Sequence, residues 1–126
     1  VYGTTVAEQP AKETDIATPQ GSYAESKAAM EEAAKPFSEN NQLFLTVTRS
    51  FNHTGPRQGT EFVVPAFARQ VARIERGLEE PIVRHGNLDA KRDFLHVRDV
   101  VRAYRLLVCE AEPEPYRLVN VSSGVG

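Results

Sequence analysis

The sequence predicts a mixed α/β fold built on a parallel sheet. Segments with helical periodicity alternate with short apolar, β-branched segments, as in layered folds whose helices cover a parallel sheet. The length of 126 residues suits one modest domain. The sequence shows no internal repeat and no low-complexity stretch that would divide this domain further.

The first helix is expected from Tyr23 to Lys35, because nearly all of these residues are strong helix formers. The preceding Pro19-Gln20-Gly21-Ser22 is turn-forming, and Ser22 is a candidate N-cap. Pro36 is expected to kink or end this helix, since proline lacks a backbone N–H and clashes with the preceding turn.

Two further helices are expected, over residues 62–76 and 97–109. The first carries apolar residues at helical spacing, and Gly77 follows it. The second carries an apolar stripe that we expect to belong to the core. We expect Cys109, at the end of this stripe, to be a small buried residue without a catalytic role.

Three strands are expected. Leu43–Phe51 is apolar and β-branched, Ile82-Val83 is a short apolar pair, and Tyr116–Val121 is the last strand. Residues 52–59 are rich in glycine and proline and are expected to form a loop. The opening Val1-Tyr2-Gly3 is typical of the tail of a strand, and we expect the chain to be a segment of a longer protein.

Composition argues against several classes of function. A formal net charge of -2 gives no basic surface for a nucleic acid or a membrane. No apolar run reaches the roughly 18 residues that span a bilayer, and no leader pattern opens the chain. The single cysteine cannot form an internal disulfide, which favours a reducing, cytoplasmic setting. The three histidines lack metal-ligand spacing, so no metal site is expected.

Tyr23 and Lys27 are the first candidates for catalysis. Four residues apart on a helix, their side chains lie on one face, one turn apart. An isolated tyrosine has a pKa near about 10, and a nearby ammonium favours the phenolate. Such a pair can give a proton to a carbonyl oxygen while hydride reaches its carbon. The same spacing also arises by chance in helices of this composition, so the flanking residues must decide.

The flanking residues contain several motifs in a fixed order. Val1-Tyr2-Gly3 and a proline-containing loop precede Ser22–Lys27 (SYAESK), and Thr48–Pro56 (TRSFNHTGP) follows. The chain continues with Gly86–Phe94 (GNLDAKRDF) and then His96–Val101 (HVRDVV). Together these motifs resemble the middle of the extended short-chain dehydrogenase/reductases, and the GNLDAKRDF segment resembles their GDP-sugar branch. The resemblance covers nearly the whole chain.

The resemblance implies a role for each candidate in the cofactor site. Tyr23 and Lys27 would be the catalytic pair and would contact NAD or NADP, with Lys27 holding the ribose hydroxyls. Phe51 would lie beside the nicotinamide ring. The sequence lacks the family's G-x-x-G-x-x-G turn, and its catalytic Ser or Thr would precede Val1.

The partner that the resemblance implies is a GDP-linked sugar. Its expected contacts are Asn52, Val63, Asn87 and Arg92. Arg92 would grip the diphosphate, because a guanidinium pairs two oxygens at once. The alternatives left open are a turn cap for Asn52 and an exposed surface position for Arg92.

The fold implied is a partial Rossmann-like doubly wound sheet: the C-terminal half of the cofactor domain with part of the sugar-nucleotide domain. Residues 1–126 would form a single incomplete α/β segment that binds NAD(P) weakly and is inactive alone. Exposed sheet edges or helices would favour a homo-oligomer.

The implied activity is NAD(P)H-dependent reduction of the C4 keto group of a GDP-linked 6-deoxyhexose. Dehydration or epimerisation of a nucleotide sugar is the enzymatic alternative; Ala66, where dehydratases tend to have a basic residue, favours reduction. A folded, non-catalytic remnant or interaction module is the other alternative.

Overall fold

The computed structural model describes residues 2 and 10–126. In this part of the chain it contains three helices and four strands. They are α1 (Ser22–Asn41), β1 (Leu45–Ser50), β2 (Asn52–Thr54), α2 (Val63–Glu75), β3 (Phe94–His96), α3 (Val97–Cys109) and β4 (Tyr116–Val121). The strands pair in parallel as β1–β4 and β2–β3, so the predicted α/β fold with parallel strands is confirmed.

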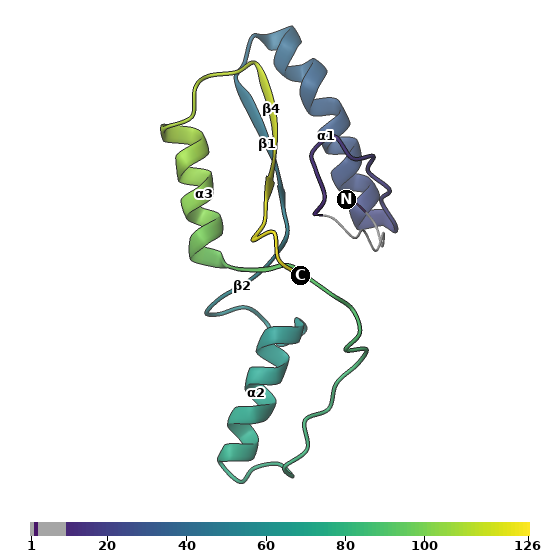
Figure 1. Cartoon of the computed structure of the whole chain (residues 1–126), viewed down its shortest axis with the longest axis vertical. Helices are drawn as coiled ribbons and strands as arrows, with labels where there is room; N and C mark the ends of the chain where they lie inside the picture. The colour runs from purple at the N-terminus through teal and green to yellow at the C-terminus, as the bar shows by residue number, and fades with distance from the viewer. Residues whose placement is uncertain (1, 3–9) are drawn as a thin grey trace.

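The β1–β4 sheet forms the centre of the molecule. Its register places Leu45 opposite Tyr116 and Ser50 opposite Val121. Helix α1 flanks this sheet on one side and α3 lies on the other (Figure 1). The buried apolar side chains of the described residues come from both layers: Val47 of β1, Val121 of β4 and Val100 of α3. The arrangement is a small, two-sided piece of a doubly wound layer.

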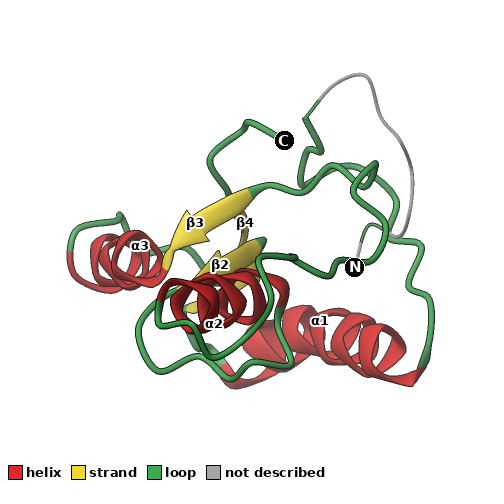
Figure 2. Cartoon of the chain, turned by 90° about the horizontal axis from the view of Figure 1, so that it is seen from below, coloured by secondary structure: helices red, strands yellow, loops and turns green. Residues whose placement is uncertain are grey.

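The β2–β3 pair and α2 form the second part of the fold. Asn52 lies opposite Phe94 and Thr54 opposite His96. Helix α2 extends away from the β1–β4 sheet, and a long segment returns from its far end to β3 (Figures 1 and 2). No residue of α2 is buried, although its apolar residues fall at helical spacing. This helix therefore contributes a wall of the site and not part of the core.

The ends of α1 differ from the prediction. The helix begins at Ser22, and the N-cap is Gly21 with φ 83°, so Ser22 is not the cap. A glycine adopts this positive φ without strain. The Gly21 carbonyl accepts the first helical hydrogen bond, from the Glu25 N–H at 3.0 Å. Pro36 does not end the helix, which continues to Asn41. Its last turn is held by buried Ser38, whose hydroxyl contacts the Leu43 carbonyl at 2.6 Å.

Several strand predictions were wrong in detail. Residues 52–54, expected in a loop, form β2, and its partner β3 was not predicted. Each of these strands has three residues and exists only because the other lies beside it. Ile82 and Val83 form no strand. In the expected strand tail, Val1 and Gly3 lie outside the described residues.

The α3 helix matches its predicted bounds, but its apolar stripe is only partly buried. Val100 is 4% exposed, whereas Val101 and Val108 are 60% and 83% exposed. Cys109 is also exposed, so its predicted burial was wrong. Helix α3 lies beside a two-stranded sheet, and Val100 is the residue of its stripe that is buried.

Candidate functional site

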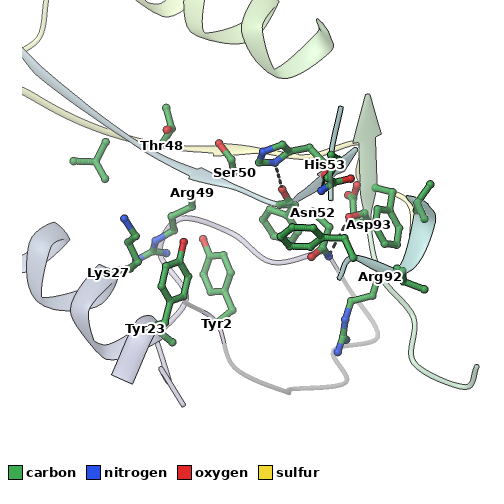
Figure 3. A pocket seen from close by; sticks show the side chains of 18 of the residues that line it. Tyr2, Tyr23, Lys27, Thr48, Arg49, Ser50, Asn52, His53, Arg92 and Asp93 are labelled. Atoms are coloured by element: carbon green, nitrogen blue, oxygen red, sulfur yellow. Dashed lines mark hydrogen bonds between the residues drawn. The ribbon is translucent and has the colours of Figure 1, made fainter. Parts of the chain in front are cut away.

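An open cavity of about 1000 Å³ lies where β1 ends and β2 begins. Ligands of open α/β sheets bind at the carboxyl ends of the strands, which is where this cavity lies. All predicted site residues except Asn87 line it: Tyr23, Lys27, Phe51, Asn52, Val63 and Arg92. In Figure 3, Tyr23 and Lys27 lie at one end and Asn52 and Arg92 at the other. The fold thus brings together residues from α1, the β1–β2 junction, α2 and the segment before β3.

Asn87 lies in a second, smaller cavity of about 400 Å³. This cavity is formed between α2 and residues 84–88, and Val63 lines both cavities. Gln70 of α2 holds the far wall in place: its Nε2 donates to the Arg84 carbonyl at 3.0 Å, and its Oε1 accepts the Arg84 N–H at 2.8 Å. The two cavities therefore adjoin at Val63, and together they contain every predicted site residue.

The Tyr23 and Lys27 side chains are adjacent, as their spacing predicts. The Lys27 Nζ lies 5.5 Å from the centroid of the Tyr23 ring. The ring is 76% exposed, so it is open to a ligand in the cavity. A tyrosine hydroxyl with a lysine ammonium one helical turn away is an arrangement suited to proton transfer.

Arg49 is a prominent feature of the site; it lies in the Thr48–Pro56 motif, but the sequence interpretation gave it no role. Its side chain points from β1 toward α1, where Nε donates to Glu31 Oε2 at 2.8 Å and Nη2 pairs with Glu31 Oε1. Its Nη1 donates to the Glu13 carbonyl at 3.2 Å. The bond to Glu31 raises the pKa of the Arg49 guanidinium above its ordinary value. The signal in the sequence was a charged residue on the same strand face as buried Val47.

Tyr2 contacts Arg49, Phe51 and Asn120 at this end of the cavity. The Arg49 guanidinium lies 4.6 Å from the centroid of the Tyr2 ring. The centroids of the Tyr2 and Phe51 rings are 6.0 Å apart. The Tyr2 hydroxyl donates to Asn120 Oδ1 at 2.6 Å. Burial, followed by the nearby Glu31 carboxylate, raises the pKa of the Tyr116 phenol. These contacts join α1, β1 and β4 beneath Tyr23 and Lys27.

The contacts of Phe51 and Ser50 fix the end of β1. The Phe51 N–H donates to the Val121 carbonyl at 2.9 Å, which sets Phe51 at the edge of the cavity. The Ser50 hydroxyl lies 2.7 Å from the Tyr104 hydroxyl of α3. This contact links β1 to α3.

The opposite end of the cavity contains Asn52 and Arg92. Asn52 Nδ2 donates to the Asp93 carbonyl at 3.4 Å, across the β2–β3 pair and not within a turn. The Arg92 side chain is exposed and its Nη1 donates to the carbonyl of neighbouring Lys91 at 3.1 Å. Arg92 and Lys91 place two cationic side chains at this end. Such a pair is suited to the oxygens of a phosphate group.

Comparison with known proteins identifies the family. The family described as GDP-mannose 4,6 dehydratase matches residues 1–123. The chain belongs to this family.

Two curated relatives represent the similarity. The chain is 38% identical over 125 residues to the GDP-6-deoxy-D-mannose reductase of Pseudomonas aeruginosa, covering 98% of this chain and 40% of that protein. It is 39% identical over 116 residues to the human GDP-mannose 4,6 dehydratase, covering 92% of this chain and 31% of the relative. The chain therefore spans less than half the length of the family members it matches.

Solved structures of family relatives confirm the fold. The structure of RMD from P. aeruginosa complexed with NADPH matches with a TM-score of 0.90 and 40% identity, covering 98% of this chain and 42% of that one. The predicted resemblance to the GDP-sugar branch and the Rossmann-like α/β fold are thus both confirmed. No helix among the described residues is long and apolar enough to cross a membrane. Within the same residues, no group of three or more His, Cys, Asp or Glu side chains is arranged to hold a metal.

Proposed function

We propose that this chain is the central segment of an NAD(P)H-dependent reductase that acts on the C4 keto group of a GDP-4-keto-6-deoxyhexose. The observation that carries the proposal is the convergence of the Tyr23–Lys27 pair with Phe51, Asn52 and Arg92 on one cavity. Support comes from the similarity to a GDP-6-deoxy-D-mannose reductase and to a structure solved with NADPH.

The residues at the α1 end suit the reduction step. A nicotinamide cofactor, when bound, would supply the hydride that reduces the C4 carbon. The Tyr23 phenol gives its proton to the C4 oxygen, so the carbonyl becomes a hydroxyl. Lys27, whose ammonium lies 5.5 Å from the ring centroid, stabilises the phenolate that remains and holds the ribose hydroxyls. Phe51 lines the same cavity of about 1000 Å³ and would lie beside the nicotinamide ring.

The other residues suit the nucleotide end of the substrate. Arg92 is exposed toward the cavity and carries a guanidinium that can pair two diphosphate oxygens. Asn52 would contact the sugar, between Arg92 and the catalytic pair. Val63 and Asn87, which line the adjoining smaller cavity, would contact the nucleoside.

The proposal includes the incompleteness of the segment. Residues 1–126 carry no glycine-rich pyrophosphate turn, so we propose that the isolated chain binds NAD(P) weakly and has no turnover. A cytoplasmic location, favoured by the single cysteine, belongs to the same proposal. So does self-association through open strand edges or exposed helix faces such as that of α3.

Dehydration of GDP-mannose is the second candidate function. The family match and the 39% identity to the human dehydratase favour it. The same Tyr23–Lys27 pair would serve both reactions, since each passes hydride at C4.

A hybrid enzyme tests the proposal. In this "hybrid reductase", the chain replaces the segment that it matches in the P. aeruginosa GDP-6-deoxy-D-mannose reductase. We expect NADPH-dependent reduction of a GDP-4-keto-6-deoxyhexose, and a loss of about 10²- to 10⁴-fold in kcat on Tyr23→Phe. A folded hybrid without turnover, or one indifferent to Tyr23→Phe, would overturn the proposal. Activity only in the equivalent hybrid with the human dehydratase, on GDP-mannose, would favour the second candidate.

A further inference from the structure

We propose that Arg49 is a positioning residue for the catalytic pair: by holding both carboxylate oxygens of Glu31, it keeps that carboxylate away from Lys27. This inference rests on the proposed function of Tyr23 and Lys27. It concerns two residues, Arg49 and Glu31, that the sequence interpretation did not include in the site.

Glu31 is the natural counter-ion of Lys27 by position. The two residues are four apart on α1, a spacing at which Lys and Glu side chains meet on the helix surface. Both also line the large cavity. An ion pair between them would neutralise the ammonium that the Tyr23 phenol needs.

The structure shows a different pairing. Both oxygens of Glu31 contact the Arg49 guanidinium, and the two side chains are only 14% and 7% exposed. Among residues 2 and 10–126, no ion pair involves Lys27, and its ammonium instead lies near the Tyr23 ring. The bidentate, shielded Arg–Glu pair is stronger than an exposed Lys–Glu pair on a helix.

Arg49 is itself held from several sides, so its guanidinium has one position. Glu13 offers its backbone carbonyl from the N-terminal loop, and the Tyr2 ring covers the guanidinium. The charged and titratable groups around Glu31 are Arg49 on β1 and Tyr116 on β4, with Tyr2 and Glu13 beyond Arg49. Lys27 lies one turn away on the same helix. Figure 3 shows Arg49 between Tyr2 and Lys27 at this end of the cavity.

Substitutions of Arg49 and Glu31 in the hybrid reductase provide the first test. We expect Arg49→Met to release Glu31 onto Lys27, to lower kcat about tenfold and to move the midpoint of the alkaline limb of the pH–rate profile upward by about one pH unit. The double variant Arg49→Met/Glu31→Gln has no carboxylate to release, so its midpoint should return to that of the parent. Arg49→Lys, whose ammonium holds fewer oxygens, should keep the fold and give a smaller upward shift. A lower melting temperature with an unmoved midpoint in both Arg49 variants would show a merely structural role and overturn the proposal.

A second test needs no catalysis and uses the 126-residue chain. Lys27→Met should leave the denaturation midpoint of the parent chain unchanged, because Lys27 is not paired with Glu31 there. In the Arg49→Lys background the same substitution should lower that midpoint, and adding Glu31→Gln should abolish the effect. Coupling between Lys27 and Glu31 already present in the parent would contradict the inference. Loss of turnover in the parent hybrid, with this coupling pattern intact, would instead count against the proposed function alone.

Discussion

The carboxylate of Asp93 holds Ser123 by three close contacts. The Ser123 N–H lies 3.0 Å from each carboxylate oxygen, and its hydroxyl donates to Oδ1 at 2.8 Å. The N–H of Gly124 donates to Oδ2 at 2.8 Å. These bonds fasten the residue next to Arg92 to the turn that follows β4. The position of Arg92 in the cavity therefore depends on a contact between segments that lie far apart in the sequence.

We expect Asp93→Ala to loosen the end of the cavity where Arg92 is proposed to bind the diphosphate. Hydrogen bonds to a charged group contribute about 1.5–3 kcal/mol, so losing this set should raise the KM of the hybrid reductase for its GDP-sugar about tenfold. The change in kcat should be small, because Tyr23 and Lys27 lie at the other end of the cavity. Steady-state kinetics and calorimetric titration with GDP would measure the effect. Asp89→Ala is the control, and an equal effect of both substitutions would contradict the prediction.

Gly55 is required where β2 passes the start of α3. A Cβ at this position would overlap the Val97 side chain, since its distance to the Val97 Cβ would be 3.2 Å and the Cγ1 atom would be closer still. Valine is stiff at χ1 and cannot turn away easily. We expect Gly55→Ala to destabilise the chain by about 1–3 kcal/mol, the usual cost of overpacking.

Gly86 provides the matched control for Gly55. A Cβ there would meet no atom within 4 Å, and its φ is not in the left-handed region. Gly86→Ala should therefore change the urea midpoint little. Equal destabilisation by both substitutions would show that the crowding at Val97 is not the cause.

Glu13 links the stability of the fold to pH. Its carboxylate accepts the Asn120 N–H at 2.7 Å, and this bond holds the pKa of the Glu13 carboxyl below its ordinary value of 4.5. The Glu13 carboxyl therefore binds its proton more tightly in the unfolded chain than in the folded one. Its contribution to the free energy of unfolding is present above the ordinary pKa and is lost as the pH falls through the lowered pKa of the folded state. Because the carboxylate is exposed, we expect no more than about 1 kcal/mol.

Urea unfolding at about pH 6 and about pH 3 would measure this contribution. Glu13→Gln should lower the stability at the higher pH and change it little at the lower one. Glu32→Gln, which removes an exposed carboxylate from the middle of α1, is the control. A difference between Glu13→Gln and the parent that is larger at low pH would contradict the assignment.

Much of the fold and the site follows from local patterns in the sequence. The bounds of α3 and β4 matched, because periodicity and β-branched composition are local properties. The adjacency of Tyr23 and Lys27 follows from helix geometry alone. The ordered motifs placed Asn52 and Arg92 on the same cavity although forty positions of chain separate them.

The remaining features depend on contacts that no local pattern contains. β2 and β3 are three residues each, and neither has a strand signal without the other. The burial of Arg49 depends on Glu31, eighteen positions earlier on another element. Val108 is 83% exposed, which the periodicity of α3 does not indicate. For the two strands and Arg49, tertiary pairing decided the outcome.

Gln70 is expected to control nucleotide binding through the wall of the smaller cavity. Its two hydrogen bonds to the Arg84 backbone hold the segment that carries Asn87 against α2. Two such bonds contribute about 1–3 kcal/mol, so Gln70→Ala should weaken GDP binding to the hybrid reductase by about five- to 150-fold. Gln70→Glu can accept the Arg84 N–H but cannot donate to the carbonyl, and should give an intermediate loss. Arg69→Ala, on the same helix with only a 3.4 Å contact to Thr60, is the control. Calorimetric titration with GDP decides the matter: an affinity unchanged by Gln70→Ala would mean that this wall does not position the nucleoside.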